Sequence, residues 1–144
     1  MTAATDSHAE TAARLRVIIA RLARQLRQNS PGGLTLSQWS ALVTIEEHQP
    51  LRIGDLADRE GFSAPTATRL VAGLEAAGLV ARTGDPSDRR TSYVELTDAG
   101  REKLFAARRT RTATLASRLS TLGPDDIERL IEALPLLEAL MVGE

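Results

Sequence analysis

Apolar side chains recur at two different spacings along the chain, and these spacings separate helices from strands. Residues 9–28 predict a long amphipathic helix, in which arginines alternate with apolar residues at Leu15, Ile18, Ile19, Leu22 and Leu26. Similar spacing predicts three shorter helices: one opening at Thr35, one ending at Gly61, and one from Ser63 to about Ala77. Two further helices are expected, from Thr97 and Asp98 to about Leu119, and from Gly123 onward.

Residues that cap or break helices support these boundaries. Thr35 with Gln38 three positions later forms a capping-box pattern, and Ser63 is a good N-cap with Pro65 in the first turn that follows. Gly61 and Gly78 are the expected terminators of the third and fourth helices. The residues from Asn29 to Gly33 should break the chain after the first helix.

Residues 79–97, LVARTGDPSDRRTSYVELT, predict two strands joined by an arginine-bearing loop. Val80, Val94 and Leu96 occupy strand-type apolar positions, while the residues from Gly84 to Ser87 favour a turn. Two helices flanking a short glycine-containing turn, followed by such a hairpin, form a winged helix-turn-helix. The expected fold is therefore mainly α with a small β-hairpin wing. We expect an N-terminal dimerisation helix in residues 1–33, the DNA-binding domain in 34–97, with its recognition helix at about 63–77, and C-terminal dimerisation helices in 98–144.

Charge is unevenly distributed, although the chain of 144 residues has a formal net charge of only -1. Residues 14–118 hold 17 basic and 11 acidic side chains, whereas the two ends together hold one basic and eight acidic ones. The basic middle favours a polyanionic partner, although arginine-rich usage is equally typical of a GC-rich genome. The absence of cysteine excludes disulfides and thiol redox switching. With neither a membrane-span pattern nor a secretory signal, we expect a cytoplasmic, nucleoid-associated protein.

The predicted fourth helix has one apolar and one smooth polar side. The side expected to face the core carries Ala67, Leu70, Val71 and Leu74. The opposite side is expected to enter a DNA major groove. It comprises Pro65, Thr66, Thr68, Arg69, Ala72, Gly73 and Ala76. Arg69 can bond a guanine, and the threonines can contact bases or phosphate. The alternative is that Arg69 is only a solvated helix arginine.

The hairpin tip carries two neighbouring arginines whose mutual repulsion a polyanion would relieve. With the fourth helix in a major groove, the wing can reach the adjoining minor groove, where Arg89 and Arg90 would insert. Asp88 should orient an arginine, either Arg90 or Arg82, which supports the wing. A solvated turn is the alternative.

The predicted sixth helix is strongly apolar, and Pro135 should cause a kink in it. Such a helix predicts burial against a second subunit, with intrachain packing as the alternative.

The run from FSAPTATRLVAGLEAAGLVAR through DPSDRR to VELTDAG resembles the recognition helix, wing and following helix cap of the MarR family of bacterial transcription regulators. The resemblance covers nearly the whole chain. It implies an obligate homodimer that binds pseudo-palindromic operators on double-stranded DNA and releases them when a small ligand binds. It places Thr68 and Arg69 at recognition positions, Arg90 as the minor-groove arginine and Asp88 as its anchoring acid, with Thr97 and Gly100 at structural positions. Charged residues are common in the family where this chain has Ala72 and Gly73.

The resemblance also implies a phenolic or other aromatic acid as effector, bound where the dimer helices meet the winged domain. Trp39 and Arg16 can form an aromatic and cationic pocket for such an anion. The alternative is that Trp39 belongs to the core and Arg16 to the solvated surface.

We expect no metal, because His8 and His48 are far apart and lack neighbouring ligands. We also expect no cofactor. No phosphate loop or catalytic grouping suggests an enzyme. A winged-helix module that binds protein instead of DNA is the remaining alternative.

Overall fold

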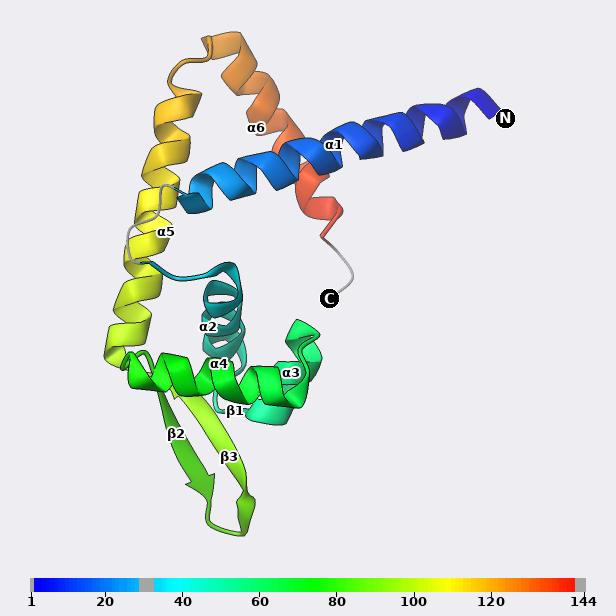
Figure 1. The fold of residues 1–144 in the computed structure, drawn as a ribbon. Helices are drawn as coiled ribbons and strands as arrows, with labels where there is room; N and C mark the ends of the chain where they lie inside the picture. Colours follow the sequence, from blue (N-terminus) through cyan, green and yellow to red (C-terminus); the bar gives the residue numbers. More distant parts are fainter. Residues whose placement is uncertain (1, 29–32, 142–144) are drawn as a thin grey trace. The chain divides into compact units, whose positions relative to one another are not determined.

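The computed structural model describes residues 2–28 and 33–141, with side chains from residue 7 onward. Its elements are α1 (Thr2–Gln28), α2 (Leu36–His48), β1 (Leu51–Arg52), α3 (Ile53–Glu60), α4 (Ala64–Ala76), β2 (Val80–Asp85), β3 (Asp88–Leu96), α5 (Asp98–Leu119) and α6 (Pro124–Ala139). The chain divides into two compact units: a winged-helix unit, Ser30–Arg109, and a helical unit made of Met1–Asn29 with Thr110–Glu144. The mainly helical fold with a hairpin wing confirms the predicted class. Figure 1 follows the chain through these elements.

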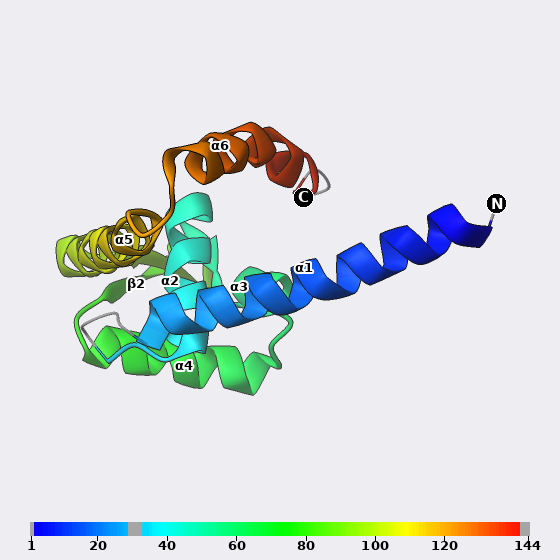
Figure 2. The same cartoon turned by 90° about the horizontal axis from the view of Figure 1, so that it is seen from above.

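The winged-helix unit has one apolar core to which every one of its elements contributes. Helices α2 and α3 pack against α4 and against each other (Figures 1 and 2). Each fully buried aliphatic side chain stabilises the fold by about 1.5–3 kcal/mol through its removal from water. The largest of these side chains are Leu42, Ile45, Leu56, Val71, Leu74, Val94 and Leu104. This core fixes the outer side of α4 and the base of the wing relative to each other.

The helix ends follow the predicted caps. Thr35 Oγ1 accepts from the Gln38 amide at 3.2 Å while Gln38 Oε1 accepts from the Thr35 amide at 2.9 Å, which completes the capping box. Ser63 Oγ accepts from the Thr66 amide at 3.3 Å. Gly61 adopts φ 68°, a left-handed conformation that glycine takes without strain, and so ends α3.

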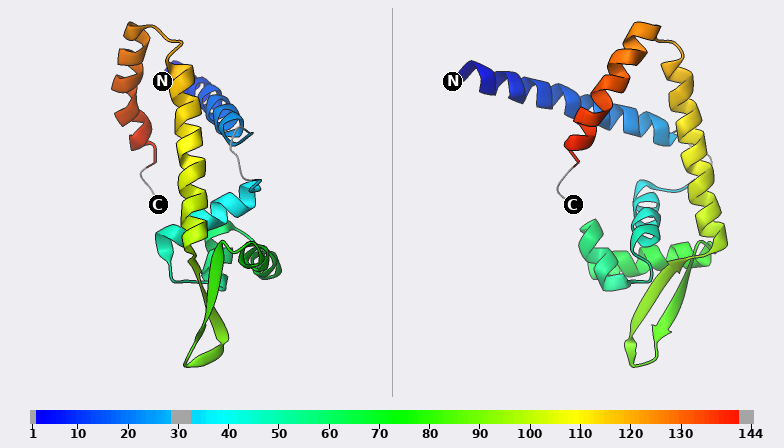
Figure 3. Two further views of the ribbon diagram at one scale, coloured as in Figure 1. Left: turned by 90° about the vertical axis from the view of Figure 1, so that its left-hand side faces the viewer. Right: turned by 180° about the vertical axis from the view of Figure 1, so that it is seen from behind.

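The wing is an antiparallel hairpin within a three-stranded sheet of order β1-β3-β2. Val80 lies opposite Leu96, and the register shifts near the tip between Gly84 and Asp85. The turn predicted at Gly84–Ser87 is shorter than expected, because strand pairing continues to Asp85. The sequence did not predict β1, whose two residues are too few to show alternation. Figure 3 shows the hairpin projecting beyond the helices of its own unit.

A tight junction joins the wing to α5. Thr97 Oγ1 donates to the Gly78 carbonyl at 2.6 Å and accepts from the Gly100 amide at 3.1 Å. A Cβ atom on Gly100 would lie 2.0 Å from the Leu79 carbonyl oxygen. The backbone therefore approaches itself so closely here that only glycine fits, which gives Thr97 and Gly100 the structural roles expected of them.

The helical unit differs from the other unit in what it leaves exposed. Helix α1 is longer than predicted, beginning at Thr2, and the Arg118 guanidinium of α5 donates to Gln25 of α1. No described residue of α6 is buried, and Pro135 lies inside this helix. Large apolar side chains therefore remain exposed on α1, on α6 and just after α6, among them Ile18, Ile19, Ile131, Leu134, Leu136, Leu140 and Met141. The breaking segment at 29–32 lies outside the described residues.

Among the described residues, no helix is both long and apolar enough to cross a membrane.

Candidate nucleic-acid interface

Helices α3 and α4 with the turn between them form the helix-turn-helix. Ala67, Val71 and Leu74 of α4 are fully buried, and Leu70 packs half-buried against the same core. These four positions are the predicted core side of the helix. The opposite side is therefore held outward by packing that fixes the rotation of α4 about its own axis.

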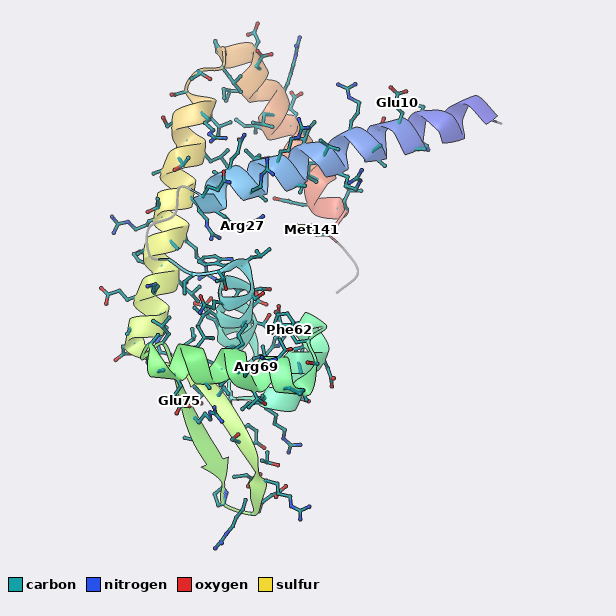
Figure 4. All side chains as sticks on the ribbon, in the orientation of Figure 1. Glu10, Arg27, Phe62, Arg69, Glu75 and Met141 are labelled. Atoms are coloured by element: carbon teal, nitrogen blue, oxygen red, sulfur yellow. The ribbon has the colours of Figure 1, made fainter. Side chains whose placement is uncertain are left out.

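The outward side of α4 is exposed throughout, as expected, and presents small side chains around one arginine. Its members are Pro65, Thr66, Thr68, Arg69, Ala72, Gly73 and Ala76. Figure 4 labels Arg69 near the middle of this helix and Glu75 near its C-terminal end. Within the described part of the chain, no side chain pairs with the Arg69 guanidinium. Its five N–H donors are thus available to an external acceptor.

Both threonine hydroxyls on this side already have local partners. Thr68 Oγ1 donates to the Ala64 carbonyl at 2.9 Å, and Thr66 Oγ1 lies 2.8 Å from Ser63 Oγ. Thr68 therefore offers its methyl group and the lone pairs of its oxygen, rather than a free donor, to any ligand. The structure thus narrows the contacts expected from Thr68 to a thymine methyl or a base donor.

Two carboxylates fix the backbone conformation of the wing tip by hydrogen bonds. Asp85 Oδ1 accepts from the Ser87 amide at 2.8 Å and from its hydroxyl at 2.7 Å. Asp88 accepts from the Arg90 amide and from the Thr91 hydroxyl, each at 2.9 Å. These bonds lower the pKa of both carboxyl groups, with Ser87 the main cause for Asp85 and the Arg90 amide the main cause for Asp88. The two acids therefore stay ionised and order the tip.

Asp88, expected to orient Arg90 or Arg82, contacts Arg90 through the backbone: its carboxylate accepts from the Arg90 amide and from the Thr91 hydroxyl. Among the described residues no guanidinium forms an ion pair with Asp88. Arg82 bonds Glu75 at the end of α4, with Nε 2.8 Å from Oε2. Arg82 thus links the wing to α4, while the side chains of Arg89 and Arg90 are exposed at the tip.

A cleft of about 530 Å³ lies in the winged-helix unit between α4, the start of α3 and the wing. Its lining includes three arginines and two acids: Arg52, Arg82, Arg90, Asp55 and Asp58. Sequence reasoning missed Arg52, which sits on the unpredicted strand β1. A strand of two residues that runs directly into α3 leaves no alternation in the sequence by which it could have been found.

The proposed effector residues belong to different units. Trp39 of α2 packs half-buried against the core of the winged-helix unit, while Arg16 is exposed on α1 of the helical unit. The pocket between them stays a prediction. Among the described residues, no group of three or more histidines and acids is placed to hold a metal ion.

An exposed, smooth recognition helix beside an arginine-tipped wing defines the winged helix-turn-helix class of regulators. A sequence profile of the MarR family matches residues 34–92. An HTH-type transcriptional regulator of Mycobacterium tuberculosis is 39% identical over 137 residues, which cover 94% of this chain and 96% of the relative. The chain belongs to the MarR family of transcriptional regulators, which are not enzymes.

Further comparisons give one more similar regulator and two similarly folded structures. The transcriptional repressor MdtR of Bacillus subtilis is 30% identical over 66% of this chain and 61% of its own. A putative transcriptional regulator from Pseudomonas aeruginosa has a TM-score of 0.84 at 28% identity, covering 94% of this chain and 96% of that one. A mutant of Staphylococcus aureus MepR bound to an oligodeoxyribonucleotide matches at a TM-score of 0.71 and 22% identity, covering 91% and 98%.

Proposed function

We propose that this regulator binds a pseudo-palindromic operator as a homodimer, with one α4 in each of two major grooves about 34 Å apart. The observation that carries the proposal is that one compact unit exposes two sets of arginines that form no ion pair with any described residue: Arg69 on α4, and Arg89 with Arg90 on the wing tip. The oligonucleotide bound by the similarly folded MepR mutant supports DNA as the ligand.

The two sets of arginines have different roles in this proposal. Arg69 reads a guanine, with Pro65, Thr66 and Thr68 contacting the same groove, whereas Arg90, assisted by Arg89, inserts into a minor groove. Arg69→Ala should weaken operator binding by about 1–3 kcal/mol and relax base preference at one position per half-site. Arg90→Ala should weaken binding to operator and unrelated DNA alike.

Selection of bound fragments from genomic DNA, followed by binding titrations with each variant, tests these roles. Equal operator binding by the wild type and both variants would contradict the assignment. The alternative function, a winged-helix module that binds protein, predicts no steep salt dependence. Phosphate contacts release counterions, so the proposed DNA binding must fall steeply as salt rises.

We further propose that the dimer is a repressor located at the nucleoid in the cytoplasm and released by an aromatic or phenolic acid. The relationship to MdtR supports repression, and the family resemblance supports such an effector. An effector acts by preferring a dimer whose wings are wrongly spaced for DNA, and it can shift occupancy only by the size of that preference.

The effector proposal places the acid near Arg16 and Trp39 and is tested with a panel of aromatic acids. A binder should change Trp39 fluorescence, raise the unfolding temperature and release the operator, and Arg16→Ala should weaken all three effects. If every acid leaves the fluorescence, the stability and the operator complex unchanged, the pocket assignment is wrong. That result would not contradict the proposed DNA binding.

A further inference from the structure

The cleft beside α4 lies between the two elements that are proposed to enter neighbouring DNA grooves, α4 and the wing. It is bordered by Thr68 on α4 and by Arg90, Thr91 and Ser92 on the wing. Major and minor grooves are separated by one sugar–phosphate strand. If α4 occupies a major groove and the wing tip the adjoining minor groove, the strand between these grooves passes the cleft.

Arg52 is held at this cleft by a cross-strand neighbour. It lies opposite Tyr93 in the β1–β3 pairing, and its Nε and Nη2 each lie 3.2 Å from the Tyr93 hydroxyl oxygen. Its guanidinium carbon is 5.6 Å from the centre of the Tyr93 ring. Two of the five N–H donors of Arg52 are thus used for positioning, which leaves others for an acceptor in the cleft.

The other charged groups of the cleft narrow the choice of ligand and place. Arg82 already has a carboxylate partner in Glu75, so its charge is largely balanced. Asp55 and Asp58 also line the cleft, and Asp55 and Asp85 lie near enough to raise the pKa of Arg52, after the larger effect of the Tyr93 hydroxyl. Among the described residues neither Arg52 nor Arg90 forms an ion pair of the kind that Arg82 forms, so an anionic group is favoured beside these two arginines, where the wing meets β1.

We propose that Arg52, positioned by Tyr93, binds a phosphate of the DNA strand that separates the two grooves. This inference rests on the proposed DNA binding and adds a contact between the recognition helix and the wing. Phosphate contacts fix the register of a protein on the duplex but carry no base preference. Arg52 therefore contributes to affinity for any duplex, whereas Arg69 contributes to choice of sequence.

The test measures binding of the full chain to an operator fragment and to an unrelated duplex by fluorescence anisotropy over a series of salt concentrations. Arg52→Ala should lower affinity for both duplexes by about tenfold at low salt and reduce the salt slope by about 1 per bound subunit. Arg52→Gln retains a donor for Tyr93 without the charge and should give the same slope. Tyr93→Phe should weaken binding by a smaller factor with the slope unchanged.

Arg59→Ala is the matched control, because it removes the same charge from an exposed arginine of the same unit that lies outside the lining of the cleft and contacts His48 Nε2 at 3.2 Å. It should bind like the wild type, and sedimentation should show that every variant keeps the same assembly state.

Wild-type affinity and slope in both Arg52 variants, with Arg90→Ala still impaired, would overturn this inference alone. A loss confined to the operator with an unchanged slope would place Arg52 on a base and also overturn it. Wild-type binding by Tyr93→Phe would remove the positioning role of Tyr93. Failure of the wild type to bind any duplex would instead overturn the proposed function.

Discussion

Asp88 orders the wing tip without touching a guanidinium, and this gives two opposing expectations for its removal. Simple Coulomb repulsion between a carboxylate and DNA predicts that Asp88→Ala binds more tightly. Loss of the bonds to the Arg90 amide and the Thr91 hydroxyl predicts a mobile tip and weaker binding. We expect the second effect to dominate, with affinity for duplex DNA reduced several-fold. Asp85→Ala, which loosens the neighbouring turn, should act in the same direction; tighter binding by Asp88→Ala would show that the carboxylate acts only as a charge.

The lowered pKa of Asp88 sets the pH range over which the tip is ordered. A carboxyl whose pKa is lower in the folded state stabilises that state above its ordinary pKa of about 3.9, and this effect is lost as pH falls through the lowered value. The Asp88–Arg90 bond should therefore be intact throughout pH 5–8. NMR titration should show the Arg90 amide resonance constant across this range and shifting only in stronger acid, together with the Asp88 carboxyl carbon. A midpoint within pH 5–8 would contradict the assignment.

Gly100 is the position where one methyl group should be least tolerated. A Cβ at this site meets the Leu79 carbonyl oxygen at 2.0 Å; the carbonyl belongs to the backbone and the backbone also fixes the Cβ position, so neither can rotate away. Gly100→Ala should lower the free energy of unfolding by about 3 kcal/mol. Gly73→Ala is the matched control, because nothing lies within 4 Å of its added Cβ and it replaces a helical glycine. That change should raise stability by about 0.5–1 kcal/mol, and thermal unfolding of the two variants measures both signs.

At the scale of elements, the sequence predicts features whose causes are local. The caps at Thr35 and Ser63 and the buried side of α4 follow from neighbouring residues and helical periodicity, and all three are confirmed. Strand β1 was missed because it exists only through pairing with β3, more than 40 residues later. The same non-local pairing places Arg52 in the lining of the cleft beside α4, so the sequence alone did not reveal it. The partner of Arg82 was also unpredictable, since Glu75 reaches it only after the wing packs beside α4.

Glu60 joins α2 to the end of α3 and should be important for the stability of the helix-turn-helix. Its carboxylate accepts from Ser40 Oγ at 2.6 Å and from Thr44 Oγ1 in a partly buried setting. Glu60→Ala removes two charge-assisted bonds and should cost about 2 kcal/mol of unfolding free energy. Glu47→Ala, at an exposed position of α2, should change it by less than about 0.5 kcal/mol. Equal losses in urea denaturation would show that the Glu60 contacts do not stabilise the fold.

At the scale of the whole molecule, the two units differ in how much apolar surface their helices expose. The winged-helix unit packs a core of aliphatic side chains, whereas no residue of α6 is buried and this helix carries exposed Ile131, Leu134 and Leu136. Single exposed apolar residues are common, but a whole helix of them is typical of a surface covered in an assembly. This contrast supports the proposed subunit pairing through the helical unit, with the proposed DNA contacts in the other unit.

Ile131→Asp should separate the subunits, because a carboxylate on α6 would have to be desolvated in the proposed interface. Leu36→Asp provides a matched control: Leu36 is 57% exposed and Ile131 59% exposed, but Leu36 begins α2 in the winged-helix unit. Sedimentation should show a dimer for the wild type and Leu36→Asp, and a monomer for Ile131→Asp. A monomer places only one recognition helix on DNA, so it should lose most of its operator affinity while retaining weak binding to a single half-site. A dimeric Ile131→Asp with normal operator affinity would place the subunit interface elsewhere.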